Sequence, residues 1–67
     1  MGYRIKEVRE ARRMSQSELA EKAGVSRGII WALETDPDAV TTTKTLLKIA
    51  KALETSVDEI FFAIDVQ

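Results

Sequence analysis

The segment SQSELAEKAGVSRGIIWALE at residues 15–34 contains two short helical patterns with one brief interruption. Ser15 and Glu18 form an S-x-x-E capping box, which predicts that a helix begins directly after Ser15. Gly24 stands where helices commonly end in a left-handed residue, a conformation that glycine adopts without Cβ strain. Ser26 is an N-cap candidate for the next helix. Because so few residues separate the two helices, the second has to cross the first steeply.

Apolar residues keep helical spacing on both sides of this segment. Residues 46–53 and 57–64 fit the i, i+3, i+4, i+7 template, and residues 5–11 have apolar side chains three apart. The sequence therefore predicts an all-α domain of five helices. Residues 62–67 alternate in hydropathy, which suits a short terminal tail or a strand formed at a dimer interface.

Further helix starts and one loop are marked along the chain. Thr42 is an N-cap candidate for the fourth helix, and Ser56 with Glu59 is a second capping box before the fifth. The only proline, Pro37, lies in the sequence TDPDAV, which predicts a loop.

The composition limits the function classes. With 67 residues the chain has room for one domain, residues 1–67, and no second core. It contains neither cysteine nor histidine, so thiolate chemistry, zinc-thiolate sites and the usual general base are excluded. We therefore expect no enzyme activity, no metal and no cofactor. No apolar run approaches the ~18 residues of a membrane span, so we expect a cytoplasmic protein that does not contact membranes.

The formal net charge of −1 is unevenly distributed. Residues 1–34 sum to +2 and residues 35–67 to −3. A surface that binds anions is therefore expected in the first half, although chance asymmetry in so short a chain is the alternative.

At these residues the sequence resembles the helix-turn-helix DNA-binding domains of the Cro/CI phage-repressor type, the XRE family. The resemblance covers residues 4–62, and the segments 46–53 and 56–61 are similar to that family's fourth and fifth helices. It implies a compact lambda-repressor-like domain and a sequence-specific DNA-binding transcriptional regulator, as a repressor. The matching residues are Gln16, Leu19, Ala20, Gly24, Val25, Ser26, Ile30, Leu33 and Glu34.

The resemblance implies that helix 27–34 enters the major groove of double-stranded DNA by its amino end. Arg27 is the candidate for base readout, because arginine binds guanine O6 and N7 together. Gln16 is similar to the family's phosphate-contacting glutamine, and an ordinary first-turn polar residue is the alternative. The expected DNA-binding residues are Gln16, Ser26, Arg27, Gly28, Ile29, Trp31, Ala32, Thr35, Thr42 and Lys44.

Helix 27–34 departs from the family pattern at Gly28, Trp31 and Ala32, because the family commonly has polar side chains at these three positions. Ile29 and Trp31 point away from the predicted buried face. Both side chains suit contact with thymine methyl groups, and for Trp31 the alternatives are the sugar-phosphate edge and a neighbouring hydrophobic surface. Few base contacts would leave specificity partly to DNA shape.

Charges near the recognition helix give two further expectations. Glu34 at a helix carboxyl end opposes the macrodipole. In the resembled family this glutamate pairs with an arginine of the first helix, and Arg9 occupies that place. Asp36 and Asp38 follow the helix where the family frequently has cations, and they would repel phosphates unless they point away.

A homodimer is expected, because regulators of this type bind twofold-related half-sites about one duplex turn apart. Its interface is expected to use Phe61, Phe62, Ile64 and Val66, although both phenylalanines would also suit the monomer core. The rival to DNA binding is a protein–protein interaction module, such as an antitoxin-like or adaptor protein on the same fold.

Overall fold

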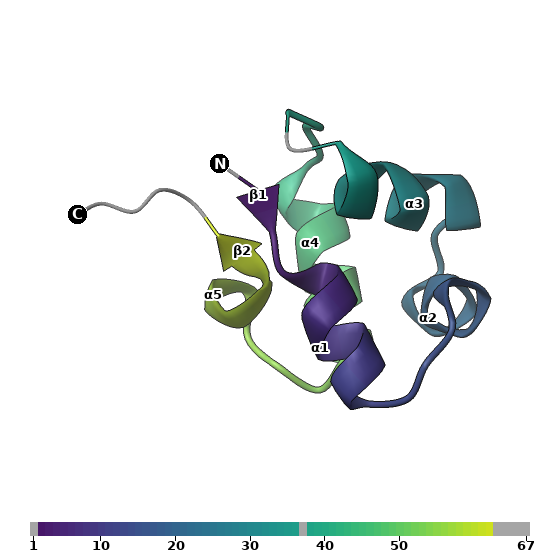
Figure 1. Cartoon of the computed structure of the whole chain (residues 1–67). Coiled ribbons are helices and arrows are strands. Elements are labelled where there is room, and N and C mark those ends of the chain that lie inside the picture. Colours follow the sequence, from purple (N-terminus) through teal and green to yellow (C-terminus); the bar gives the residue numbers. More distant parts are fainter. Residues whose placement is uncertain (1, 37, 63–67) are drawn as a thin grey trace.

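The computed structural model describes residues 2–36 and 38–62. Within these ranges five helices form the body of the domain, and two short strands join its ends (Figure 1). The all-α fold class is confirmed. The elements in chain order are β1 (Gly2–Tyr3), α1 (Ile5–Ala11), α2 (Gln16–Ala23), α3 (Arg27–Thr35), α4 (Thr43–Ala52), α5 (Val57–Ile60) and β2 (Phe61–Phe62).

The predicted caps begin three of the helices. Ser15 Oγ accepts the Glu18 N–H at 3.0 Å, and a Glu18 carboxylate oxygen accepts the Ser15 N–H at 2.8 Å, which completes the capping box before α2. Ser26 and Thr42 begin α3 and α4 in the same way, each accepting the N–H three residues later at 3.2 and 3.1 Å. These bonds satisfy N–H groups that a helix start otherwise leaves without a partner.

The turn between α2 and α3 has the predicted geometry. Gly24 has φ 74°, in the left-handed region. The Val25 N–H then donates to the Ala20 carbonyl at 3.0 Å, which closes the end of α2, and the half-buried Val25 packs against the core. In Figure 1 α2 is seen nearly end-on while α3 lies across the view, so the two helices cross steeply.

One hydrophobic core joins all five helices. Its side chains follow the helical periodicity of the sequence, and six of them are completely buried: Ile5, Leu19, Ile30, Ile49, Leu53 and Ile60. Ala20, Ala23, Ala50 and Ala52 are also buried, which lets the backbones of α2 and α4 approach closely.

Helix α5 is shorter than the apolar template of residues 57–64, of which residues 63 and 64 lie outside the described residues. Helix α5 ends at Ile60, and Phe61–Phe62 pairs antiparallel with Gly2–Tyr3. The Arg4 N–H also donates to the Ile60 carbonyl at 2.7 Å. Hydrogen bonds to the chain start therefore replace the next helical turn, which the local apolar spacing does not reveal. Before α5, the Glu59 N–H bonds the backbone carbonyl of Ser56 at 3.1 Å.

Among residues 2–36 and 38–62, two helix ends have a left-handed residue that is not glycine. Glu54 after α4 has φ 56°, and Arg13 after α1 has φ 58°. The Arg12 guanidinium donates to the carbonyls of Leu53 and Glu54, which satisfies acceptors at the end of α4. No sequence pattern predicts this role of Arg12, because its partners lie some 40 residues away along the chain.

Candidate nucleic-acid interface

Helix α3 lies at the edge of the domain with one side in the core and the other exposed (Figure 1). Ile30 and Leu33 are 0% and 3% exposed and form its buried side. We call the remaining side the outer surface of α3. It consists of the exposed Arg27, Gly28, Ile29, Trp31 and Thr35 and the half-buried Ala32.

The outer surface has a centre and two flanks. Since successive helical residues are rotated by roughly 100°, Gly28 and Thr35 lie opposite the buried side, and Ala32 lies between this line and Ile29. Ile29 and Trp31 lie on opposite flanks of that line and are 39% and 57% exposed. The predicted outward orientation of these two side chains is therefore present, and the centre between them carries only small residues.

A buried ion pair holds α3 from behind. Arg9 Nε donates to Glu34 Oε2 at 2.7 Å, and Arg9 Nη2 donates to Glu34 Oε1 at 3.0 Å. The two side chains are 9% and 2% exposed. Arg9 Nη1 also donates to the Met14 carbonyl at 2.7 Å, so one guanidinium joins α1, the α1–α2 turn and α3. The expected Arg9–Glu34 pair is thus present, in the bidentate geometry typical of strong pairs.

The hydrogen bond from Glu34 is the main cause that raises the pKa of Arg9 above its ordinary value. Burial lowers this pKa, while the negative charges of Glu34 and of Glu10, 4.0 Å away, raise it further. Arg9 is therefore fully ionised over the whole physiological range.

Gln16 takes part in the same network. Its Nε2 donates to Glu34 Oε1 at 3.0 Å, which places the first residue of α2 against the back of α3. A glutamine amide has two N–H groups and an acceptor oxygen, so the Glu34 contact does not exhaust its donors. The family resemblance implied a phosphate contact for Gln16, and neither it nor the residue pattern indicated this contact with Glu34.

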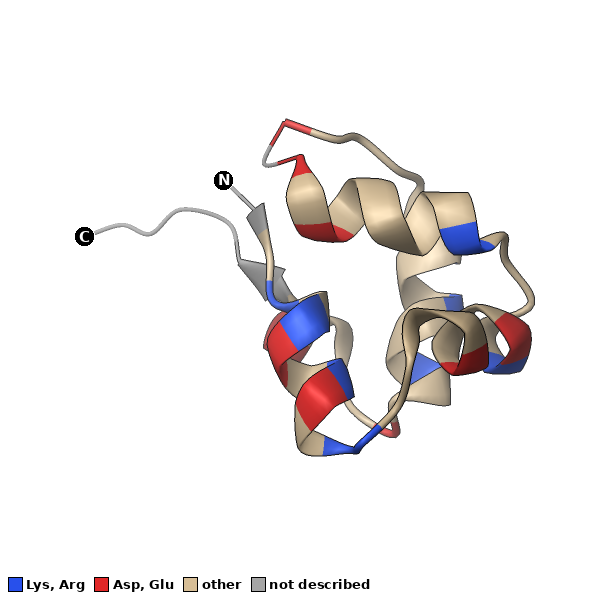
Figure 2. Ribbon diagram, turned by 45° about the vertical axis from the view of Figure 1, so that its right-hand side comes forward, with Lys and Arg blue, Asp and Glu red and all other residues tan. Residues whose placement is uncertain are grey.

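Several polar groups of α3 already have partners within the chain. Ser26 Oγ caps the helix, and Thr35 Oγ1 donates to the Trp31 carbonyl at 2.8 Å. Glu34 is buried in its ion pair. Arg27 is therefore the one charged side chain that α3 exposes. In Figure 2 the ribbon of α3 is accordingly almost free of charge colours between its basic start and its acidic end.

The loop after α3 contains Asp36 and Asp38, the two residues expected to repel phosphates unless they point away. An Asp36 carboxylate oxygen accepts the Asp38 N–H at 2.9 Å, and the Ala39 N–H donates to the Asp36 carbonyl at 3.0 Å. The Tyr3 hydroxyl donates to the Ala39 carbonyl at 3.1 Å, which ties the loop to β1. Asp36 thus stabilises the loop, and both aspartates are exposed. In Figure 2 the end of α3 and the loop after it carry the acidic colour.

The start of α4 follows this loop. Thr42 caps the helix, and its hydroxyl also bonds the Thr45 hydroxyl at 3.0 Å. Lys44 is exposed in the first turn. These positions suit the predicted phosphate contacts, because the N–H groups of a helix start attract anions.

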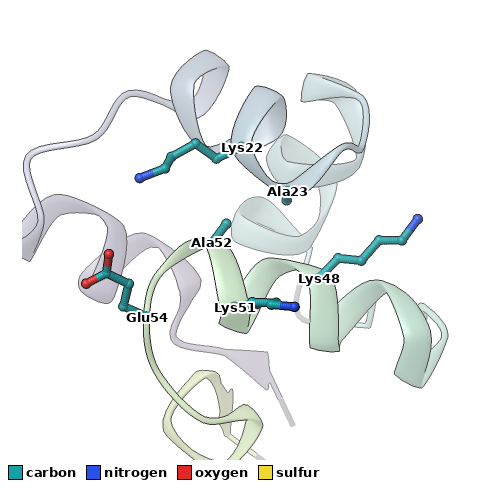
Figure 3. A pocket seen from close by; sticks show the side chains of 6 residues that line it. All are labelled: Lys22, Ala23, Lys48, Lys51, Ala52 and Glu54. Atoms are coloured by element: carbon teal, nitrogen blue, oxygen red, sulfur yellow. The ribbon is translucent and has the colours of Figure 1, made fainter.

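A separate concavity of about 360 Å³ lies between the ends of α2 and α4 (Figure 3). Lys22 and Lys48 at its rim point to different sides in this view, so their amines do not converge on one point. Lys22 and Lys51 lie in the last turns of their helices, where cations offset the carbonyl ends. The concavity therefore needs no ligand to explain its charges.

No group of three or more metal-binding side chains occurs in the described part of the chain. None of the helices in residues 2–36 and 38–62 is long and apolar enough to cross a membrane.

Solved structures share this architecture. The restriction-modification controller protein C.AhdI from Aeromonas hydrophila superposes with a TM-score of 0.79 at 31% identity, covering 87% of this chain and 86% of its own. The biofilm master regulator SinR in complex with DNA superposes with a TM-score of 0.77 at 36% identity, covering 82% of this chain and 87% of its own. The N-terminal DNA-binding domain of SinR from Bacillus subtilis superposes with a TM-score of 0.76 at 36% identity, covering 82% of this chain and 80% of its own.

No curated protein matches the chain by sequence. A family model described as helix-turn-helix matches residues 5–60, which includes all five helices. That match and the similar structures agree with the α2–α3 geometry. The chain therefore belongs to the XRE-type helix-turn-helix family.

Proposed function

We propose that this protein is a sequence-specific DNA-binding transcriptional regulator that inserts α3 into the major groove. The observation that carries the proposal is the two-sided construction of α3. The Arg9–Glu34–Gln16 network fixes its back, while its outer surface is exposed. A rigid helix with a free outer side fits the width of the major groove. C.AhdI is a controller protein and SinR a regulator solved with DNA, which supports the same role here.

The charges of the interface support an approach by the start of α3. Arg27 lies in the first turn, where the helix dipole also attracts phosphate. Its guanidinium can read guanine in bidentate fashion, worth about 1–3 kcal/mol of discrimination. The second N–H of Gln16, the start of α4 at Thr42 and the exposed Lys44 are the proposed phosphate contacts.

Selection of bound sequences from a random duplex pool tests this proposal. We expect enrichment of one motif, and log K falling with log[salt] by about 0.9 for each phosphate contacted. Arg27→Ala should relax the motif at one position per half-site. Lys6→Ala removes the same charge from an exposed position of α1 and serves as the matched control, because it should leave the motif unchanged. An unenriched pool would refute the proposal.

We also propose that the regulator binds as a homodimer. The described part of the chain offers an apolar surface for it, because Leu47 is 55% exposed and borders a groove between α4 and α5 that Val57 also lines. Of the residues expected at the interface, Ile64 and Val66 lie outside the described residues, as do the side chains of Phe61 and Phe62. Leu47→Lys should shift sedimentation toward the monomer. A wild-type protein that stays monomeric at high concentration, both free and on DNA, would exclude the dimer.

Repression is the proposed mode of regulation, which the family resemblance to phage repressors supports. A reporter gene with the selected site between promoter and start codon should be less expressed when the protein is present. Higher expression would show activation instead.

A protein–protein interaction module is the second candidate. The acidic loop tip at Asp36 and Asp38 and the 57% exposure of Trp31 favour it. Under this alternative, the protein binds a partner tightly and its association with DNA shows no salt dependence.

A further inference from the structure

The fold of this chain does not require glycine at position 28. Gly28 does not have a left-handed φ, and a Cβ built there would lie 3.8 Å from Ser26 Oγ, an ordinary contact, and near nothing else. Glycine inside a helix is nonetheless less stable than alanine. A glycine at position 28 is consistent with a partner outside the chain that approaches the backbone of α3 closely.

The side chains beside Gly28 are apolar on one flank. Ile29 and Ala32 are three residues apart, so they are neighbours on the helix surface. Arg27 and Trp31 are four residues apart and occupy the other flank. A β-branched side chain such as Ile29 has one strongly preferred rotamer in a helix, so it is held in place before any partner binds.

The base edges in the major groove include one apolar group, the C5-methyl of thymine. We propose that the flank formed by Ile29 and Ala32 recognises this methyl group, and that Gly28 lets α3 come close enough for these side chains to reach it. The inference rests on the proposed binding to DNA. Arg27 then supplies the polar readout and the Ile29–Ala32 flank supplies discrimination of thymine from cytosine.

The contacts within α3 support this division. Ser26 and Thr35 use their hydroxyl groups inside the chain, and the Glu34 side chain is 2% exposed. Apart from Arg27, the outer surface consequently has few hydrogen-bonding groups that are not already engaged. Apolar contact is the interaction that this surface offers most.

Single replacement of each thymidine in the selected duplex by deoxyuridine tests the inference, because deoxyuridine lacks only the methyl group. At the thymidine read by Ile29 we expect wild-type binding to weaken roughly fourfold, the effect of losing one buried methyl-sized group. In Ile29→Ala the same replacement should weaken binding less than twofold. In the matched control Trp31→Ala, altered on the opposite flank, the fourfold loss should persist.

Three results would overturn the inference. The first is a wild-type protein that tolerates deoxyuridine at every position while binding the duplex with normal salt dependence; DNA binding then stands and methyl recognition does not. The second is a deoxyuridine effect of equal size in wild type and Ile29→Ala. The third, failure to enrich any duplex, refutes DNA binding itself. Should Ile29→Ala not fold, as judged by circular dichroism, the wild-type replacement series decides alone.

Discussion

Replacing Arg9 by methionine should unfold most of this protein at 25 °C. The variant leaves the carboxylate of Glu34, which is 2% exposed, without its cation. Removing one partner of a buried ion pair costs about 3–5 kcal/mol. The Met14 carbonyl loses its 2.7 Å donor as well. Since a core of this size supplies only about 3–5 kcal/mol in total, the loss of the pair alone equals the expected stability. The lost Met14 bond adds to this loss, so the unfolded state should predominate.

The double variant Arg9→Met/Glu34→Met should be more stable than either single variant. Replacing both members of a buried pair by apolar residues is often neutral, because no uncompensated charge stays behind. What persists is the Met14 carbonyl without its donor, which costs about 1–3 kcal/mol. The exposed pair Arg4–Glu7, at 3.2 Å and 50% and 72% exposure, provides a matched control cycle. Its coupling should stay below about 1 kcal/mol.

Urea unfolding followed by far-ultraviolet circular dichroism measures both cycles. All variants are compared in the same concentration of trimethylamine N-oxide, which favours the folded state and gives the single variants a measurable folded fraction. Because the pKa of Arg9 is raised in the folded state, its contribution is fully present below the ordinary pKa and is lost only as pH rises through the raised one. The coupling should therefore be equal at about pH 7 and about pH 10. A double variant that loses the sum of the two single losses would show that the pair does not hold α1 to α3.

Four further substitutions test the local structure. Glu54→Gly should raise the free energy of unfolding by about 1 kcal/mol, because Glu54 has the left-handed φ of 56°. Gly24→Ala should lower it by a similar amount, because Gly24 has φ 74°, although a Cβ there would meet nothing within 4 Å. The urea midpoints of the two variants measure both effects. Gly28→Ala should raise the thermal midpoint by up to about 8 °C, the equivalent of about 1 kcal/mol, and it should weaken binding to the selected duplex. A more stable variant with unchanged affinity for the duplex would show that α3 does not need glycine here for close approach to DNA. Ser15→Ala should cost about 1 kcal/mol by loss of the capping box, and an unchanged urea midpoint would show that the cap does not stabilise α2.

The elements of this fold were predictable where the signal is local. Ser15, Gly24 and Ser26 act through bonds to residues three or four positions away, so their spacing alone predicts the α2–α3 unit. The helical periodicity likewise predicted the buried side of α3. The Arg9–Glu34 pair became an expectation only through the family resemblance, because nothing in the local pattern joins residues 25 positions apart.

The sequence by itself determined the five helices, the turn at Gly24 and the lack of charged residues between Arg27 and Glu34 in α3, since these follow from short-range sterics, capping and residue type. Only the tertiary structure decided where α5 stops, because Ile60 and Phe61 bond to the chain start rather than to the next helical turn. It also assigned Arg12 to the end of α4, and it placed Gln16 against Glu34. Contacts of this kind depend on which surfaces the packed core brings together, and no periodicity along the chain encodes that.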